Sequence, residues 1–76
     1  MKVAVIGAGG HVGFPFACVV ADAGHMVYGI DINGDAVREL NRGIVPYVEE
    51  GAAPVLRKNL DTGNLLFTVE IGRAHV

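Results

Sequence analysis

The stretch VIGAGGHVGFP, residues 5–15, decides the fold of this chain. A short apolar run over residues 3–6 leads into it, four glycines follow between positions 7 and 13, and apolar residues resume directly afterwards. Continuous apolar runs with β-branched residues are typical of strands that are covered on both faces. Glycine-dense turns between a strand and a helix let main-chain amides approach a phosphate. The pattern therefore predicts a strand, a phosphate-binding turn and a helix.

Strand and helix patterns alternate along the rest of the chain. Apolar residues recur at helical spacing from residue 11 to residue 23, and Gly24 is placed to end this helix. The later elements expected are a strand over 26–30, a helix over 34–41 capped by Asn33 and ended by Gly43, a loop over 44–51, a helix over 52–60 and a strand over 65–69. This alternation predicts an α/β fold, a truncated Rossmann-type (doubly wound) parallel sheet with three strands in the order 3-2-1. Residues 1–70 are thus expected to be the N-terminal part of a dinucleotide-binding domain.

The glycines have distinct expected roles. In dinucleotide-binding folds the first glycine lets the strand turn, the second lets a pyrophosphate approach the main chain, and the last lets helix and strand pack closely. Gly7, Gly9 and Gly13 suit these roles. The spacing is G-x-G-x-x-x-G, one residue longer than the commonest G-x-G-x-x-G, so either Gly9 or Gly10 takes the middle role. A tight turn with no ligand is the structural alternative.

The start of the expected helix provides the groups that would bind the phosphates. The free amides there are those of Gly10, His11 and Val12. Unsatisfied N–H groups and the helix dipole favour an anion at this end of a helix. We therefore expect a pyrophosphate to bind these amides, and His11 to contribute through its main-chain N–H.

Asp31 follows the second predicted strand, 18 residues after Gly13. A carboxylate at this place can accept both hydroxyls of an adenosine ribose. A 2′-phosphate would bring like charges together, at a cost of about 4 kcal/mol per charge pair for a 4 Å separation and an effective dielectric near 20. Ile32, which we also expect to contact the cofactor, and Asn33 offer no arginine to offset this repulsion. The sequence therefore predicts NAD rather than NADP, with a helix-capping or turn aspartate as the alternative.

Composition limits the class of protein. The chain has 76 residues, 51% of them hydrophobic, and a formal charge of -2, so it holds one small domain without a bias toward nucleic acid or an anionic membrane. The single cysteine, Cys18, excludes an internal disulfide, and three scattered histidines give no metal-ligand spacing. Too few apolar residues precede the glycines for a signal peptide. We expect a cytoplasmic protein with no metal.

The last six residues, IGRAHV at 71–76, follow neither a turn nor a helix pattern. A reverse translation of this tail matches the start of a common sequencing adapter. We therefore expect residues 71–76 to be a sequencing or cloning artefact and the chain to be the front part of a longer protein. A genuine frayed terminus is the alternative.

With these residues placed, the sequence resembles the N-terminal NAD-binding domain of the UDP-glucose/GDP-mannose dehydrogenase family, in particular its UDP-N-acetylmannosamine dehydrogenase-like members. The motifs that carry the resemblance are KVAVIGAGGHVGFPFA at 2–17, AGHMVYGIDIN at 23–33, PYVEEGA at 46–52 and LRKNLDTGNLLFT at 56–68. The resemblance implies NAD contacts at Gly7, Gly9 or Gly10, His11, Val12 and Asp31, and it matches Glu49 to a glutamate of the family's loop. The chain departs from the family in its longer glycine loop, in Ala36, where many members have lysine or arginine, and in Glu50, which replaces a frequent proline.

The resemblance also implies an activity for the full-length parent. Family members oxidise the C6 alcohol of a nucleotide sugar, here expected to be a UDP-sugar, to a carboxylate in two NAD-dependent steps through a cysteine thioester. Such enzymes act in polysaccharide biosynthesis, and the parent is expected to be a homo-oligomer. The catalytic cysteine, lysine and aspartate of the family lie downstream of residue 76, so this piece alone is expected to be inactive. Cys18 falls inside a helix core and does not replace them.

Two other readings remain open from the sequence. The first is a regulatory nucleotide-binding module of the kind that gates potassium transport, which shares the strand, glycine loop, helix, strand and terminal acid. The long stretch PYVEEGAAPVL, residues 46–56, argues against it. The second is another NAD-dependent dehydrogenase, of the hydroxyacyl or 6-phosphogluconate type.

Overall fold

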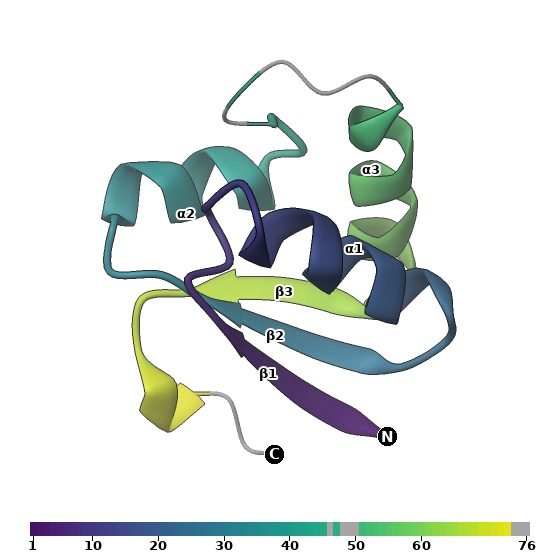
Figure 1. The fold of residues 1–76 in the computed structure, drawn as a ribbon, viewed down its shortest axis with the longest axis horizontal. Helices are drawn as coiled ribbons and strands as arrows, with labels where there is room; N and C mark the ends of the chain where they lie inside the picture. The colour runs from purple at the N-terminus through teal and green to yellow at the C-terminus, as the bar shows by residue number, and fades with distance from the viewer. Residues whose placement is uncertain (46, 48–50, 74–76) are drawn as a thin grey trace.

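The computed structural model of the chain describes residues 1–45, 47 and 51–73. The elements are β1 Lys2–Ile6, α1 Gly13–Asp22, β2 Met26–Ile30, α2 Gly34–Asn41, α3 Ala52–Thr62, β3 Leu65–Thr68 and a short 3-10 helix, η1, at Ile71–Arg73 (Figure 1). The predicted elements are confirmed in type and order. The fold is thus the expected α/β arrangement.

The three strands form one parallel sheet in the order β1-β2-β3, which is the predicted order 3-2-1 read from the other edge. Val5 lies beside Gly29, and Gly29 lies beside Phe67. A Cβ on Gly29 would stand 2.6 Å from the Phe67 ring, so the ring occupies the space that a side chain would fill. Because the strands are parallel, their carboxyl ends share one edge, and the glycine loop and Asp31 both follow at that edge.

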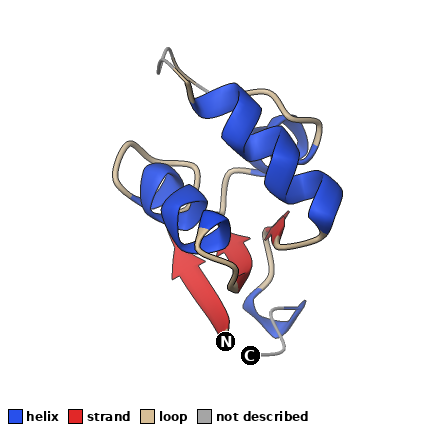
Figure 2. Ribbon diagram, turned by 90° about the vertical axis from the view of Figure 1, so that its right-hand side faces the viewer, coloured by secondary structure: helices blue, strands red, loops and turns tan. Residues whose placement is uncertain are grey.

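The helices α1, α2 and α3 lie on the same face of the sheet (Figures 1 and 2). The core is between these helices and the sheet, and its buried residues are Val5, Ala8, Phe14, Ala17, Cys18, Ala21, Val27, Val37, Leu40, Leu56, Leu65 and Phe67. Successive side chains of a strand point to opposite faces. Ile6, Tyr28 and Leu66 therefore point away from the helices, and Ile6 and Leu66 are exposed.

Two helix ends follow the predicted chemistry. The side chain of Asn33 accepts a hydrogen bond from the Ala36 N–H at 3.1 Å, so Asn33 caps α2 as predicted. Gly43, expected to end α2, has a φ of +80° two residues after the helix. Local sequence therefore fixes both limits of this helix.

Other element limits differ from prediction by one or two residues. α1 begins at Gly13, not at residue 11, because the preceding residues form the glycine turn. α3 continues to Thr62, two residues beyond the expected end. β3 ends at Thr68, whose hydroxyl accepts the Glu70 N–H at 3.2 Å and turns the chain away from the sheet. The tail pattern predicted no helix, whereas residues 71–73 form η1, a single turn of 3-10 helix.

The outer edge of β3 is paired with a side chain. The amide of Asn41, at the end of α2, donates to the Phe67 carbonyl at 2.8 Å, and its oxygen accepts the Phe67 N–H at 3.0 Å. These two hydrogen bonds replace, at one residue of the sheet edge, those that a neighbouring strand would make. Asn41 therefore fixes α2 to β3 and satisfies main-chain groups that an edge strand leaves open.

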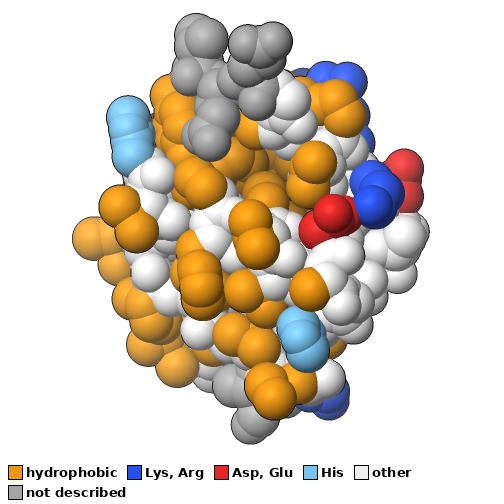
Figure 3. All heavy atoms as spheres, turned by 45° about the vertical axis from the view of Figure 1, so that its right-hand side comes forward, with side chains coloured by type: hydrophobic (Ala, Val, Ile, Leu, Met, Phe, Trp, Pro, Cys, Tyr) orange, Lys and Arg blue, Asp and Glu red, His pale blue; other side chains and the backbone are white. Residues whose placement is uncertain are grey.

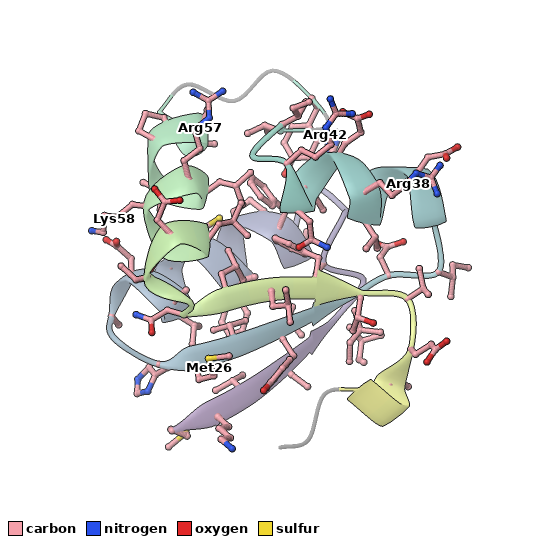
Figure 4. All side chains as sticks on the ribbon, turned by 180° about the vertical axis from the view of Figure 1, so that it is seen from behind. Met26, Arg38, Arg42, Arg57 and Lys58 are labelled. Atoms are coloured by element: carbon pink, nitrogen blue, oxygen red, sulfur yellow. The ribbon has the colours of Figure 1, made fainter. Side chains whose placement is uncertain are left out.

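Polar groups also join α1 to α3. Lys58, which extends outward from α3 in Figure 4, lies 2.6 Å from the Asp22 carboxylate at the end of α1. The buried Asn59 donates to the same carboxylate oxygen at 3.4 Å and to the Val55 carbonyl at 3.0 Å. These bonds lower the pKa of Asp22, first through the Lys58 hydrogen bond, then through Asn59 and through the charge of Lys58.

The described surface is rich in large apolar side chains. Figure 3 shows them spread over one face, with acidic and basic groups toward its rim. The most exposed are Ile32, Met1 and Val12, at 97%, 86% and 85%. The helices of the described ranges are not long and apolar enough to cross a bilayer.

Candidate cofactor-binding site

The glycine loop leaves β1 and is fixed at once to the neighbouring strand. The N–H groups of Gly7 and Ala8 both donate to the Ile30 carbonyl, at 2.8 and 3.1 Å. Gly7 has a φ of +73°, a backbone conformation that residues other than glycine adopt only at an energetic cost. The turning role predicted for Gly7 is therefore confirmed.

Gly13 lies where α1 passes closest to the loop. A Cβ at Gly13 would stand 2.3 Å from the Gly7 carbonyl oxygen and 2.8 Å from its carbon. Both atoms belong to the main chain, so no side-chain rearrangement can relieve this overlap. The packing role predicted for the last glycine is confirmed.

Gly9 and Gly10, the two candidates for the middle glycine, differ in the space around them. A Cβ at Gly9 would lie 2.9 Å from Oδ2 of Asp31, whereas one at Gly10 would meet only the Gly7 oxygen at 3.4 Å. The Gly9 N–H donates to the same Asp31 oxygen at 2.9 Å. Gly9 is therefore the position at which the loop approaches a neighbouring group too closely for a side chain.

The free amides lie one residue later than predicted. The Gly10 N–H donates to the Gly7 carbonyl at 3.0 Å, so the expectation that it is free is wrong. The extra residue of the loop closes a turn over residues 7–10 and uses that donor. Within the described part of the chain, the N–H groups of His11, Val12 and Gly13 have no acceptor. These three donors stand at the start of α1, where the helix dipole favours an anion.

Asp31 lies at the carboxyl end of β2 and is partly buried. Its Oδ2 accepts the Gly9 N–H, and its Oδ1 accepts the Asn33 N–H, each at 2.9 Å. An ionised carboxylate offers about four acceptor positions, so two hydrogen bonds leave room for ligand hydroxyls. The structure thus brings Asp31 and the glycine loop into direct contact.

A hollow of about 330 Å³ lies at the same end of the sheet. It is bounded by the ends of β1 and β2 and by the chain after β3, and its lining residues are Ile6, Gly7, Ile30, Asp31, Ile32, Val69 and Ile71. Asp31 is the acid among otherwise apolar side chains. Ligand sites typically combine apolar walls with a few convergent polar groups. Ile32, predicted to contact the cofactor, therefore lies beside Asp31 in the wall of a hollow of this kind.

A second hollow, of about 240 Å³, lies between α1 and α3 and contains none of the predicted site residues. Phe14, Val19 and Val55 are among its lining side chains. We place the site at the glycine loop because the unpaired amides and Asp31 are there. Cys18 borders this second hollow but is 6% exposed, in keeping with the structural role expected for it.

The remaining predictions concern the connection between α2 and α3. Glu49 and Glu50 lie outside the described residues. Tyr47, which the sequence places only within the motif at 46–52, contacts the glycine loop through the ring of His11, to which its own ring is tilted by 37°. Periodicity cannot identify such a residue, because two helices and a strand separate it from the loop along the chain. Its aromatic character within a loop was the available signal.

A parallel sheet, a glycine turn at its carboxyl edge and an acid after the second strand define a dinucleotide-binding domain. The family model described as "UDP-glucose/GDP-mannose dehydrogenase family, NAD binding domain" matches residues 1–76. The chain belongs to this family, and NAD is the cofactor of the matched domain. The expected family and cofactor are confirmed, and the potassium-transport alternative is set aside.

Known proteins of the family are similar along nearly the whole chain. UDP-glucose 6-dehydrogenase TuaD of Bacillus subtilis is 37% identical over 73 residues, which are 96% of this chain and 16% of that protein. Among solved structures, a ternary complex of GDP-mannose dehydrogenase from Pseudomonas aeruginosa has a TM-score of 0.92 and 31% identity, over 97% of this chain and 17% of that one. UDP-D-ManNAc dehydrogenase from Pyrococcus horikoshii has a TM-score of 0.90 and 30% identity, over 95% and 17%.

The chain spans about a sixth of the length of these dehydrogenases.

Proposed function

We propose that this chain is the NAD-binding portion of a nucleotide-sugar 6-dehydrogenase that oxidises the C6 alcohol of a UDP-sugar to a uronate. One observation carries the proposal: the glycine loop closes onto Asp31 and leaves three adjacent amides, those of His11, Val12 and Gly13, without an acceptor in the described chain. Family membership and the names of the relatives support the reaction.

The three amides would bind the cofactor diphosphate, and Asp31 would accept the hydroxyls of the adenosine ribose. The shape of the glycine loop supports this assignment of the diphosphate, because a Cβ at Gly9 would overlap Asp31 and a Cβ at Gly13 would overlap the Gly7 main chain. NAD, when bound, supplies the hydride acceptor of the oxidation. The part played by this chain is to hold and orient that cofactor.

We propose NAD in preference to NADP because Asp31 would lie against a 2′-phosphate. Arg38 extends from α2 (Figure 4) and is paired with Asp35, its neighbour on the same helix. The chain has Ala36 rather than a basic residue beside Gly9, where a Cβ on Gly9 would be 3.5 Å from the alanine methyl group. A phosphorylated ribose would therefore meet a carboxylate and a methyl group.

We further propose that this chain binds NAD weakly and does not oxidise the sugar by itself. The family resemblance implies a catalytic cysteine, lysine and aspartate, and we expect these downstream of residue 76. Calorimetric titration of the chain with NAD and NADP tests the cofactor assignment. An equal or higher affinity for NADP would overturn it.

The substrate is tested in the full-length parent. Reduction of NAD is followed with UDP-glucose, UDP-N-acetylmannosamine and GDP-mannose, the sugars named among the relatives. Turnover of a UDP-sugar is expected. Turnover of GDP-mannose alone would replace the UDP assignment while leaving the NAD-binding role intact.

A further inference from the structure

Tyr47 reaches the glycine loop from the connection between α2 and α3. Its ring centroid lies 4.2 Å from that of His11, with an interplanar angle of 37°. Its hydroxyl donates to the Gly10 carbonyl at 3.4 Å, across 37 residues of chain. Tyr47 is partly buried, and its ring stands edge-on to the core residue Phe14 at 6.0 Å. One side chain thus connects the loop, the first turn of α1 and the core.

These contacts surround the unpaired amides. Gly10 and His11 precede Val12 and Gly13 in the chain, and Phe14 follows them, so Tyr47 touches both sides of the donor segment. The side chains of His11 and Val12 are exposed. A glycine-rich segment loses much conformational freedom when it is fixed, so contacts that fix it beforehand reduce the cost of binding a ligand.

We propose that Tyr47 is a positioning residue that holds the amides of His11, Val12 and Gly13 in the arrangement that binds a diphosphate. This inference rests on the proposed NAD-binding role of the loop. It assigns Tyr47 to the diphosphate and not to the adenosine, because Asp31 reaches the loop through Gly9, outside the Tyr47 contacts. Loss of Tyr47 should therefore weaken ligands that carry a diphosphate and leave binding of adenosine unchanged.

The test uses the 76-residue chain and three variants. Tyr47→Ala removes the ring and the hydroxyl, Tyr47→Phe retains the ring, and His11→Ala removes the ring contact from the His11 side. Tyr28→Phe, on the sheet face opposite the helices, is the control. The first readout is ¹⁵N relaxation of the amides of residues 11–13 without ligand. We expect increased mobility in Tyr47→Ala and His11→Ala, and wild-type values in Tyr47→Phe and Tyr28→Phe.

The second readout is calorimetric affinity for NAD, for ADP and for adenosine. We expect Tyr47→Ala to bind NAD and ADP about tenfold more weakly, as for the loss of one preorganised side chain, with adenosine unaffected. A purely structural role would weaken all three ligands alike. Should Tyr47→Ala fail to fold, His11→Ala answers the same question.

The outcomes separate the two proposals. Unchanged relaxation of residues 11–13 in His11→Ala and in any folded Tyr47→Ala overturns the positioning role, whether or not NAD binds. Absence of NAD binding to the wild-type chain, together with increased mobility in the variants, overturns the cofactor role while supporting the ordering by Tyr47. Equal weakening of NAD and adenosine also rejects the assignment to the diphosphate.

Discussion

The carboxylate of Asp31 accepts the main-chain N–H of Gly9 at 2.9 Å, across 22 residues of chain. The same oxygen would stand 2.9 Å from a Cβ at Gly9. The acid expected to select the cofactor therefore also holds the glycine loop, and the loop needs glycine at position 9 because Asp31 is there. The proposed selection of the ribose and the shape of the glycine loop therefore depend on one contact.

Replacement of Gly9 by alanine should displace this contact. Steric overlap of this kind costs about 1–3 kcal/mol, so we expect Gly9→Ala to bind NAD about tenfold or more weakly in titration calorimetry. Gly10→Ala is the matched control, because its Cβ meets only the Gly7 oxygen at 3.4 Å. A larger loss in Gly10→Ala than in Gly9→Ala would show that the middle glycine is assigned to the wrong residue.

Replacement of Asp31 by asparagine should change cofactor preference. The variant removes the negative charge, and with it a repulsion of about 4 kcal/mol toward a 2′-phosphate. We expect weaker binding of NAD and a smaller ratio between the affinities for NAD and NADP. Asp61→Asn, an exposed acid in α3, should leave that ratio unchanged. An unaltered ratio in Asp31→Asn would remove the selecting role from this residue.

Much of this arrangement is predictable from the sequence. Periodicity gives the elements, and glycine spacing places the tight positions Gly7 and Gly13. The hydrogen bond between Gly9 and Asp31 is not predictable, because a pattern assigns both residues to one edge of the sheet without showing which atoms meet. The Gly10 amide was assigned wrongly for the same reason, since the inserted residue closes a turn whose donor only the geometry identifies.

The contacts of Asn41 and Tyr47 also cannot be predicted from the sequence. Each joins segments more than 20 residues apart, Asn41 to Phe67 and Tyr47 to Gly10. Neither residue belongs to an apolar repeat, so periodicity says nothing about its neighbours. Tertiary packing, not local propensity, selects these partners.

Gly13→Ala should destabilise the fold itself. The added methyl group would overlap the Gly7 carbonyl at 2.3 Å, so α1 must move away from the loop. We expect the free energy of unfolding in urea to fall by about 1–3 kcal/mol. Gly72→Ala has no atom within 4 Å of its Cβ and serves as the control. Equal stability of the two variants would contradict the close approach of α1 to the glycine loop.

Loss of the Asn41 side chain should expose the edge of β3. Asn41→Ala removes both hydrogen bonds to Phe67, and leaving these main-chain groups unpaired costs about 1–3 kcal/mol. Urea unfolding measures the difference. Arg42→Ala, at the next position, removes only an exposed contact with Glu39 at 3.9 Å and should have little effect. A loss in Arg42→Ala as large as that in Asn41→Ala would argue against the edge-pairing role.

Acid should release the contact between α1 and α3. The Lys58 hydrogen bond, the Asn59 hydrogen bond and the Lys58 charge hold the pKa of Asp22 below its ordinary value of 3.8. Because the folded-state pKa is the lower one, the carboxylate stabilises the fold fully above pH 3.8, and this contribution disappears as the pH falls through the folded-state value. Urea unfolding of the wild type and of Asp22→Asn at a series of pH values should show the wild type more stable at pH 6 and the two converging in strong acid. Lys58→Met removes the main cause of the pKa shift and should show the same convergence with the wild type. A difference in stability that stays constant down to strong acid in both variants would exclude Asp22 as the titrating group.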